Sequence, residues 1–441
     1  MGRTLRRARK KMEEHPIREC EKIRKKFAPS LYKWFGKVKD PRNPSYVTYE
    51  MTEMLGTLYF KYLVGLTSMR SMTEYFDDEK IRNSLYHYLG ANEKERLPHY
   101  QTVNDLLCRV NPDEIEEIIQ KLDYQLIRQK RFYDARYNGK WLIIVDATTT
   151  YSGKRELNKQ CQERRHKNGT EQETISYQWA ILEAKIYLGN GLVASIGSEF
   201  IENHGADYER QKTMGAEAFK QDCETKAFKR LAEKIKKRFP RLPICIMGDS
   251  LYVSEPVMDL CRANNWEFLL RYKDGSAPSI AEEFENIPDK EEISYTDPVT
   301  RRKGELCFVN DIGYRKHEVH MVRYIETDKN GKKKKFQFLS SMRMDKHNAK
   351  QTVDTGRCRW KIENQGFKRQ KIEAQDITHI CSWNAQAMKN HYLIEQLADL
   401  IRKLYELWFL AKQGIQKTQK KISSDLLMSL YWPPTESEDT S

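Results

Sequence analysis

Two aspartates that close apolar runs are the residues of this sequence best suited to metal chemistry. Asp146 ends the run WLIIVD and Asp249 ends the run ICIMGD. Short apolar runs of this kind predict buried strands. Carboxylate oxygens are ligands that Mg²⁺ prefers, and two such ions about 3.5–4 Å apart can promote attack on a phosphodiester. An aspartate at a strand end is also a common turn former, so either residue alone is weak evidence.

A third acid lies in the segment RCRWKIENQGFKRQK, residues 357–371. Arg359 and Glu363 are four residues apart, so on a helix they share one face. This spacing also fits an ordinary surface ion pair worth roughly 0.5 kcal/mol or less. As a hypothesis, Asp146 bridges two metal ions, with Asp249 as a ligand on one side and Glu363 on the other.

The string Arg-Trp-x-Ile-Glu-Asn in this segment resembles the third catalytic segment of bacterial insertion-sequence transposases of the DDE class. That family has the pattern Tyr-x₂-Arg-x₃-Glu-x₆-Lys. VDATTTY and MGDSLYV are similar to the segments around the family's two aspartates, and the resemblance spans residues 141–400. It implies that Asp146, Asp249 and Glu363 are the catalytic residues and hold two Mg²⁺ ions, for which Mn²⁺ can substitute.

The sequence departs from the family pattern at two positions. The family's tyrosine falls on Gly356, and its lysine, seven residues after Glu363, falls on Gln370. On an ideal α-helix Gln370 lies about 20° from the direction of the glutamate and Lys371 about 80° from it. Lys371 is therefore the expected substitute for the family's lysine, and the tyrosine has no counterpart.

Positive charge is concentrated in two segments of a chain whose formal charge is +14. Residues 1–40 carry 14 Lys/Arg against 5 Asp/Glu, and residues 152–168 carry 6 against 2. Basic clusters attract polyanions, and phosphate contacts supply most non-specific DNA affinity, although many soluble proteins have a basic surface. The residues expected to contact DNA are Arg359, Lys371, Lys368, Lys154, Arg155, Arg164 and Arg165.

The elements around the aspartates follow an order typical of an α/β sheet. Strands are expected at 141–151, 175–188, 192–201, 244–249 and 267–273, with helices at 211–238 and 253–266. The crossover through the helix at 211–238 predicts parallel strands, whose carboxyl ends are where α/β folds bind ligands. The resemblance implies an RNase H-like (retroviral-integrase-like) mixed sheet with flanking helices.

The rest of the chain is expected to add an all-helical N-terminal domain and a β-rich insertion. Residues 47–135 have helical periodicity, preceded by a basic arm. Residues 274–340 are β-like, with Asn330-Gly331 as a hairpin turn and FQFLSS returning to the main sheet. Helices are expected at 348–371 and 376–412. The predicted domains are 1–135 (DNA-binding), 136–273 (core, first part), 274–337 (insertion), 338–412 (core, second part, with C-terminal helices) and 413–441 (a partly disordered tail).

Several classes of protein lack support in the sequence. No apolar run approaches the roughly 18–20 residues of a membrane span, and the basic N-terminus has no apolar segment typical of a secretory signal. Nine dispersed cysteines without a CxxC pair indicate free thiols in a reducing cytosol, so a cytoplasmic, nucleoid-associated protein is expected. GxxxxGK[ST], GxSxG and HExxH motifs are absent.

The sequence thus predicts a DNA transposase of an insertion sequence. It is expected to bind terminal inverted repeats, cleave the DNA strand and transfer the 3′-hydroxyl to target DNA, as a homodimer in the synaptic complex. Two alternatives are an RNase H-like nuclease that cuts without joining and a decayed or domesticated derivative that only binds DNA. The sequence does not give the repeat or target sequences, the host, the cleavage route through or without a hairpin, or the stage at which a dimer assembles.

Overall fold

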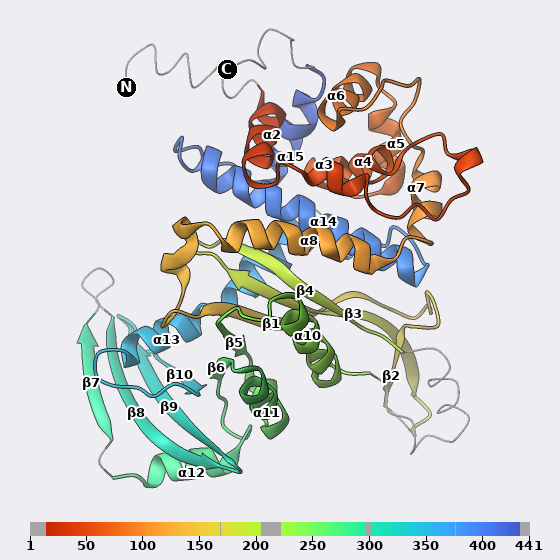
Figure 1. Ribbon diagram of the computed structural model, residues 1–441. Coiled ribbons are helices and arrows are strands. Elements are labelled where there is room, and N and C mark those ends of the chain that lie inside the picture. The colour runs from red at the N-terminus through yellow and green to blue at the C-terminus, as the bar shows by residue number, and fades with distance from the viewer. Residues whose placement is uncertain are drawn as a thin grey trace, which may run out of the picture.

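β1 (Trp141–Gly153) lies in the middle of the sheet because its first five residues are apolar and buried on both faces. The computed structural model describes residues 15–167, 169–203, 222–288, 290–296, 302–374 and 376–432. Within these residues the strands form one ten-stranded sheet, with the order β2-β3-β1-β5-β6-β10-β9-β8-β7 and β4 paired to β3 (Figure 1).

The central strands have the topology expected of an RNase H-like core. β1 is antiparallel to β3 (Thr174–Tyr187), which is antiparallel to β4 (Val193–Ile201). On its other side β1 is parallel to β5 (Ile244–Gly248), and β5 is parallel to β6 (Glu267–Arg271). α10 (Glu224–Arg238) precedes β5, and α11 (Glu255–Asn264) joins β5 to β6. The predicted parallel pairing is confirmed; the expected helical segment 211–221 lies outside the described residues.

The two faces of β1 pack against different layers. Ile143 and Val145 belong to the larger apolar core, which includes side chains of α10 and α11. Leu142 and Ile144 belong to a second cluster, which includes Val353 of α13 (Ala349–Arg357). Side chains alternate along a strand, so Asp146 projects to the same face as Leu142 and Ile144.

The N-terminal helices pack around α14 (Ala385–Tyr405), so the first and last parts of the chain form one helical layer beside the sheet (Figure 1). α2, α4 and α8 all contact α14. The other elements of this layer are α2 (Pro16–Phe27), α3 (Leu31–Phe35), η1 (Pro44–Tyr46), α4 (Met51–Leu63), α5 (Met69–Phe76), α6 (Glu79–Leu89), α7 (Tyr100–Leu107), α8 (Pro112–Ile127), η2 (Lys130–Ala135) and η5 (Glu406–Leu410).

The C-terminal segment corrects the prediction of a tail from residue 413. α15 (Gln419–Ser429) is a regular helix, and its apolar residues Ile422 and Leu426 are buried. α15 packs on α2, where the Oγ of Ser429 accepts a hydrogen bond of 3.0 Å from the backbone N–H of Ile17. Spacing of four residues between the buried side chains accounts for the helix. Residues 433–441 lie outside the described part of the chain.

The β-rich insertion is present and extends the same sheet. Its strands are β7 (Glu291–Thr296), β8 (Lys303–Tyr314), β9 (His317–Thr327) and β10 (Lys333–Ser340). β10 pairs antiparallel with β6, which confirms the predicted return to the main sheet. Two elements were not expected: α12 (Pro278–Asn286), which begins with a proline suited to a first helical turn, and β2 (Gln162–His166), an edge strand too polar to show an apolar pattern.

Candidate active site

The register of two parallel strands brings Asp146 and Asp249 side by side. Ile144 of β1 is opposite Met247 of β5. Each aspartate comes two residues later in the chain, so the same register places Asp146 opposite Asp249. Neighbouring strands lie only about 4.8 Å apart. Asp249 then leaves the strand, and its Oδ1 accepts a hydrogen bond of 2.8 Å from the backbone N–H of Leu251 in η3 (Ser250–Tyr252).

Glu363 approaches this edge from a π-helix. The predicted helix at 348–371 is in fact two elements, α13 and η4 (Ile362–Glu373), separated by Cys358–Lys361. This is a correction, because η4 has the i→i+5 bonds of a π-helix rather than the α-helical pattern that the sequence predicted. Ile362 is fully buried in the same cluster as Ile144. η4 also contacts β1, and this packing holds the adjacent Glu363 near the end of that strand.

The charges of the three acids interact. Burial raises the pKa of Asp146, the Arg359 guanidinium opposes this rise, and the charges of Asp249 and Glu363 raise that pKa further. Asp249 and Glu363 are therefore both near enough to Asp146 for their charges to act on it. Mutual repulsion of this kind makes a group of carboxylates receptive to a cation.

Arg359 supplies positive charge at the site. Its Nη1 lies 3.4 Å from Oδ2 of Asp146, and the side chains are 17% and 24% exposed. Arg359 comes from the turn between α13 and η4, where its backbone N–H donates to the carbonyl of Gly356. The sequence suggested that Arg359 pairs with Glu363 or with DNA; in the structure its ion-pair partner is Asp146.

The three carboxylates fit a pair of hard divalent cations by their chemistry, since all offer oxygen ligands. With Asp146 between two ions, Asp249 and Glu363 would bind different ions and need not lie in one tight group. Among the described residues, the group of three possible ligand atoms within 4.8 Å of one another is a different one, Asp311, Glu318 and His320.

That second group, in the insertion, already has other partners. Arg343 forms an ion pair of 2.6 Å with Asp311. The Nδ1 of His320 accepts a hydrogen bond of 3.1 Å from the backbone N–H of Asp311. These contacts account for the close approach of the side chains without a metal ion.

Glu224 is an acid of the site that sequence reasoning missed. It is the first residue of α10, and its Oε1 accepts a hydrogen bond of 2.7 Å from the hydroxyl of Tyr252. Burial raises the pKa of Glu224; the bond from Tyr252 opposes this, while the charges of Asp146 and Asp249 add to it. No pattern in the sequence indicated it, because the crossover helix was expected to begin at residue 211 and not at Glu224.

The π-helix changes which basic residues can reach the site. Gln370 is fully buried, and its Nε2 donates to Oε1 of Gln396 and Oδ2 of Asp399, each at 2.9 Å. The α-helical estimate that put Gln370 near the direction of Glu363 is therefore wrong. Lys368 is exposed, and Lys371 is half-buried, with a pKa lowered by burial.

Four basic residues after β1 were expected to contact DNA, and two of them already interact with other side chains. Lys154 and Arg164 are exposed, and Arg164 lines a cavity together with Glu224. The guanidinium of Arg155 lies 3.7 Å from the ring centroid of Trp383. Arg165 forms ion pairs with two acids, including Glu163 at 2.8 Å, so its charge is already matched.

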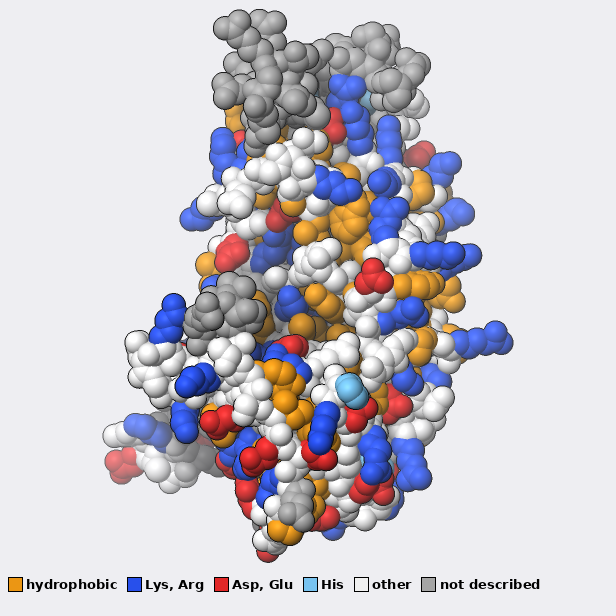
Figure 2. All heavy atoms as spheres, turned by 90° about the vertical axis from the view of Figure 1, so that its left-hand side faces the viewer, with side chains coloured by type: hydrophobic (Ala, Val, Ile, Leu, Met, Phe, Trp, Pro, Cys, Tyr) orange, Lys and Arg blue, Asp and Glu red, His pale blue; other side chains and the backbone are white. Residues whose placement is uncertain are grey.

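On the side of the molecule where β7 lies in Figure 1, Lys and Arg are numerous over the upper, helical part, whereas Asp and Glu gather at the lower end (Figure 2).

Gly356, where the family pattern has tyrosine, lies against Phe338 of β10. A Cβ atom at this position would lie 2.5 Å from the ring of Phe338. The ring therefore occupies the space beside α13 that a larger side chain at position 356 would need. A tyrosine there would require Phe338 to move.

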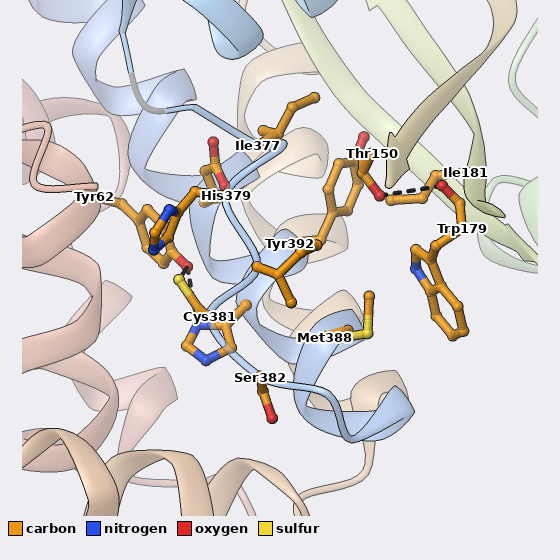
Figure 3. Close-up of a pocket in the computed structure, with 13 residues that line it drawn as sticks. Tyr62, Thr150, Trp179, Ile181, Ile377, His379, Cys381, Ser382, Met388 and Tyr392 are labelled. Carbon is orange, nitrogen blue, oxygen red and sulfur yellow. Dashed lines mark hydrogen bonds between the residues drawn. The ribbon is translucent and has the colours of Figure 1, made fainter. Parts of the chain in front are cut away.

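Another, small cavity has none of the three predicted catalytic acids in its lining; Figure 3 shows the residues that line it. It has a volume of about 40 Å³ and is lined by residues such as Thr150, Tyr62 and Tyr392. The hydroxyl of Tyr62 and Nδ1 of His391, which also lines it, share a hydrogen bond of 2.9 Å. Small-molecule sites are usually about 300–1,000 Å³, so this is a packing cavity with room for a few waters.

Two family models match parts of this chain. Residues 220–384 match the model of the transposase DDE domain, and residues 32–122 match the DDE_Tnp_1-associated model. The two matches together cover more than half of the chain, and the first includes Asp249, Glu363 and Glu224. The matches support a DDE-class transposase.

The remaining comparisons are more distant. The cryo-EM structure of the piggyBac transposase synaptic complex with hairpin DNA is similar with a TM-score of 0.44 and 12% identity, over 95% of this chain and 80% of that chain. No curated protein matches the sequence.

None of the described helices has the length and apolar character needed to cross a membrane. All nine cysteines are free thiols, as predicted.

Proposed function

We propose that this transposase cleaves DNA at the ends of an insertion sequence and joins the freed 3′-hydroxyl to target DNA. Asp146, Asp249 and Glu363 would hold two Mg²⁺ ions, with Mn²⁺ as a substitute. The proposal is supported by the β1–β5 register, which aligns Asp146 with Asp249, and by the contact of η4 with β1, which brings Glu363 near the same strand end. Divalent ions bound there would activate the attacking oxygen and stabilise the leaving oxygen.

Arg359 would change partner when DNA binds. In the structure its guanidinium offsets the charge of Asp146 at 3.4 Å. Once cations neutralise Asp146, the guanidinium becomes available for two parallel hydrogen bonds to a phosphate, which is a geometry that arginine favours. Arg359 would then orient the reacting phosphate beside the carboxylates.

The remaining DNA contacts would come from exposed basic residues. Lys368 on η4, Lys154 and Arg164 are the candidates nearest in sequence to the acids, with Lys371 and Arg155 less exposed or already stacked. The helical N-terminal region would bind the terminal inverted repeats. A homodimer would hold two ends together in the synaptic complex, and a cytoplasmic, nucleoid-associated location follows from this role.

A joining assay tests the proposal. The purified protein is mixed with Mg²⁺, a labelled oligonucleotide that has a prepared 3′-hydroxyl end from the element, and plasmid target. We expect labelled joined products from the wild-type protein and none from Asp249→Asn. Cleavage without joining would favour the nuclease alternative. DNA binding with neither reaction would favour a derivative that only binds DNA.

A further inference from the structure

Glu224 is fixed to the turn that carries Asp249. Tyr252 lies three residues after Asp249, is fully buried and donates its hydroxyl proton to Oε1 of Glu224 at 2.7 Å. The ring of Tyr252 also packs edge-on against Phe228 of α10, with the ring centroids 5.1 Å apart. The first turn of α10 and the turn after β5 therefore hold each other in place.

The glycine before Asp249 makes this arrangement possible. A Cβ atom on Gly248 would lie 2.7 Å from the ring of Tyr252. With glycine there, the ring can fold back beside the end of β5 and reach α10. The segment GDSLY thus places the second aspartate and the hydroxyl that binds Glu224 in one compact unit.

Glu224 also borders open space at the start of α10. It lines a polar cavity of about 450 Å³ whose wall includes Ala147, the residue after Asp146, but none of the three carboxylates. Gln162, Arg164 and Gln178 contribute other polar side chains to its wall. Among the described residues, Oε2 of Glu224 has no hydrogen-bond partner, whereas Oε1 is bound by Tyr252. A carboxylate oxygen beside open space can accept a hydrogen bond from an ordered water.

We propose that Glu224 is a fourth carboxylate of the active site, a positioning residue whose Oε2 would orient a water molecule of the Mg²⁺ that Asp146 and Asp249 would bind. This inference rests on the proposed function. Mg²⁺ keeps several waters when it binds to proteins, so an acid placed just outside its direct ligands can orient one of them. Carboxylates in that outer position commonly contribute about 10–100-fold to metal affinity or activity.

Metal binding tests this role directly. Free Mn²⁺ is measured by electron paramagnetic resonance during titration of the full chain with Mn²⁺, and cleavage is measured over a range of Mg²⁺ concentrations. Glu224→Gln keeps an oxygen that can accept the Tyr252 bond but removes the charge. We expect it to raise the Kd for Mn²⁺ and the half-maximal Mg²⁺ concentration by about 10-fold or more. Glu233→Gln, at an exposed position of the same helix, should change neither.

Two further variants separate the possible failures. Tyr252→Phe should shift metal affinity in the same direction as Glu224→Gln but by less, because the carboxylate remains. Glu224→Gln with wild-type metal affinity, whether or not its Tm falls, would overturn the inference and leave Glu224 with a structural role. If Asp249→Asn and Glu363→Gln also cleave and join like wild type, the proposed function itself fails.

Discussion

The π-helix η4 connects two charged regions. In one region most acids lack a cationic partner among the described residues, and in the other each acid is paired with a cation of the protein. At its beginning, Glu363 approaches Asp146 and Asp249, and Arg359 is the cation paired with Asp146. From Arg369, six residues after Glu363, the same helix enters a buried network beneath α14. There Arg369 contacts Asp399 at 3.1 Å and Glu406 at 2.6 Å.

The buried network matches each charge with a partner. Lys403 forms an ion pair of 2.6 Å with Asp399. Although burial alone would raise it, Lys403 and Arg369 hold the pKa of Asp399 well below its usual range. Burial lowers the pKa of Lys403 to about 8, with Asp399 opposing this change. These charges stabilise the joint between η4 and α14 and leave little affinity for an added ion.

At the carboxylate site, in contrast to the buried network, the acids outnumber the cations that pair with them. Asp146 is half-buried with a raised pKa, and two other acids contribute to that rise. Such an arrangement costs stability unless a cation binds, which is typical of sites shaped for function rather than for folding. Acids at the two ends of η4 can therefore be assigned to structure or to chemistry by whether cations of the protein already neutralise them.

The largest expected effect is the loss of chemistry when a site acid is neutralised. Asp146→Asn, Asp249→Asn or Glu363→Gln should each lower the rate of cleavage and joining by about 1,000-fold or more, which is on the order of 4 kcal/mol of transition-state stabilisation. Single-turnover assays on labelled DNA measure this rate. Asp399→Asn, if it folds, should retain the Mg²⁺ dependence of the wild type. If the three site variants kept wild-type rates, the carboxylate site could not be distinguished by function from the buried network around Asp399.

Breaking the buried network should instead affect folding. Arg369→Ala leaves Asp399 and Glu406 buried without one partner, and loss of a partner in a buried ion pair costs about 3–5 kcal/mol. Urea unfolding monitored by circular dichroism gives the change in the free energy of unfolding. A loss below about 1 kcal/mol would mean that the network contributes little to the fold.

A smaller, opposite effect on stability is expected at Asp146. Burial raises its pKa in the folded state, so the ionised carboxylate destabilises the metal-free protein above that pKa. Asp146→Asn should therefore stabilise the metal-free protein at pH 7, by about 0.5–2 kcal/mol. The difference should shrink as the pH falls towards the unfolded value of about 3.9.

Thermal melts in a chelator at pH 7 and at pH 5 check this sign. Glu233→Gln, an exposed substitution, serves as the control and should leave Tm unchanged at both pH values. Added Mg²⁺ should stabilise the wild type and reduce its difference from Asp146→Asn, because only the wild type binds the ion. An Asp146→Asn variant that is less stable than wild type at pH 7 would contradict the account.

The smallest expected effects are in DNA affinity. Lys368→Ala should weaken binding to DNA of any sequence and reduce the salt dependence of log Kd by about 1, as for the loss of one phosphate contact. Lys371→Ala should have less effect because Lys371 is half-buried. Fluorescence anisotropy over a range of salt concentrations measures both. Lys329→Ala, in the hairpin turn of the insertion, is the control, and an equal effect there would show that the contacts are not specific to η4.

Much of the fold could be predicted because its strands have strong local patterns. The runs before Asp146 and Asp249 are apolar throughout, and the register between them follows from their parallel pairing. β2 could not be predicted because QERRH is polar and becomes a strand only by pairing with β3. α15 was missed because its apolar pattern is short and its buried side chains are covered only when the helix packs on α2.

The candidate site was less predictable where tertiary packing decides the backbone. η4 is a π-helix over its whole length. Within it, a Cβ atom on Gly366 would lie 3.2 Å from the Lys185 side chain, and Gln370 donates a hydrogen bond to Asp399. No local pattern in RWKIENQGFKRQK specifies those long-range contacts. Glu224 has no motif of its own, and Tyr252, which connects it with Asp249, is 28 residues away in the chain.

The most direct test of the central claim is anomalous diffraction from crystals of the protein with DNA and Mn²⁺. The account predicts two anomalous peaks about 3.5–4 Å apart, with Asp146 between them and with Asp249 and Glu363 on opposite sides. Peaks elsewhere, such as beside Asp311 and His320, with none between these three carboxylates, would contradict it.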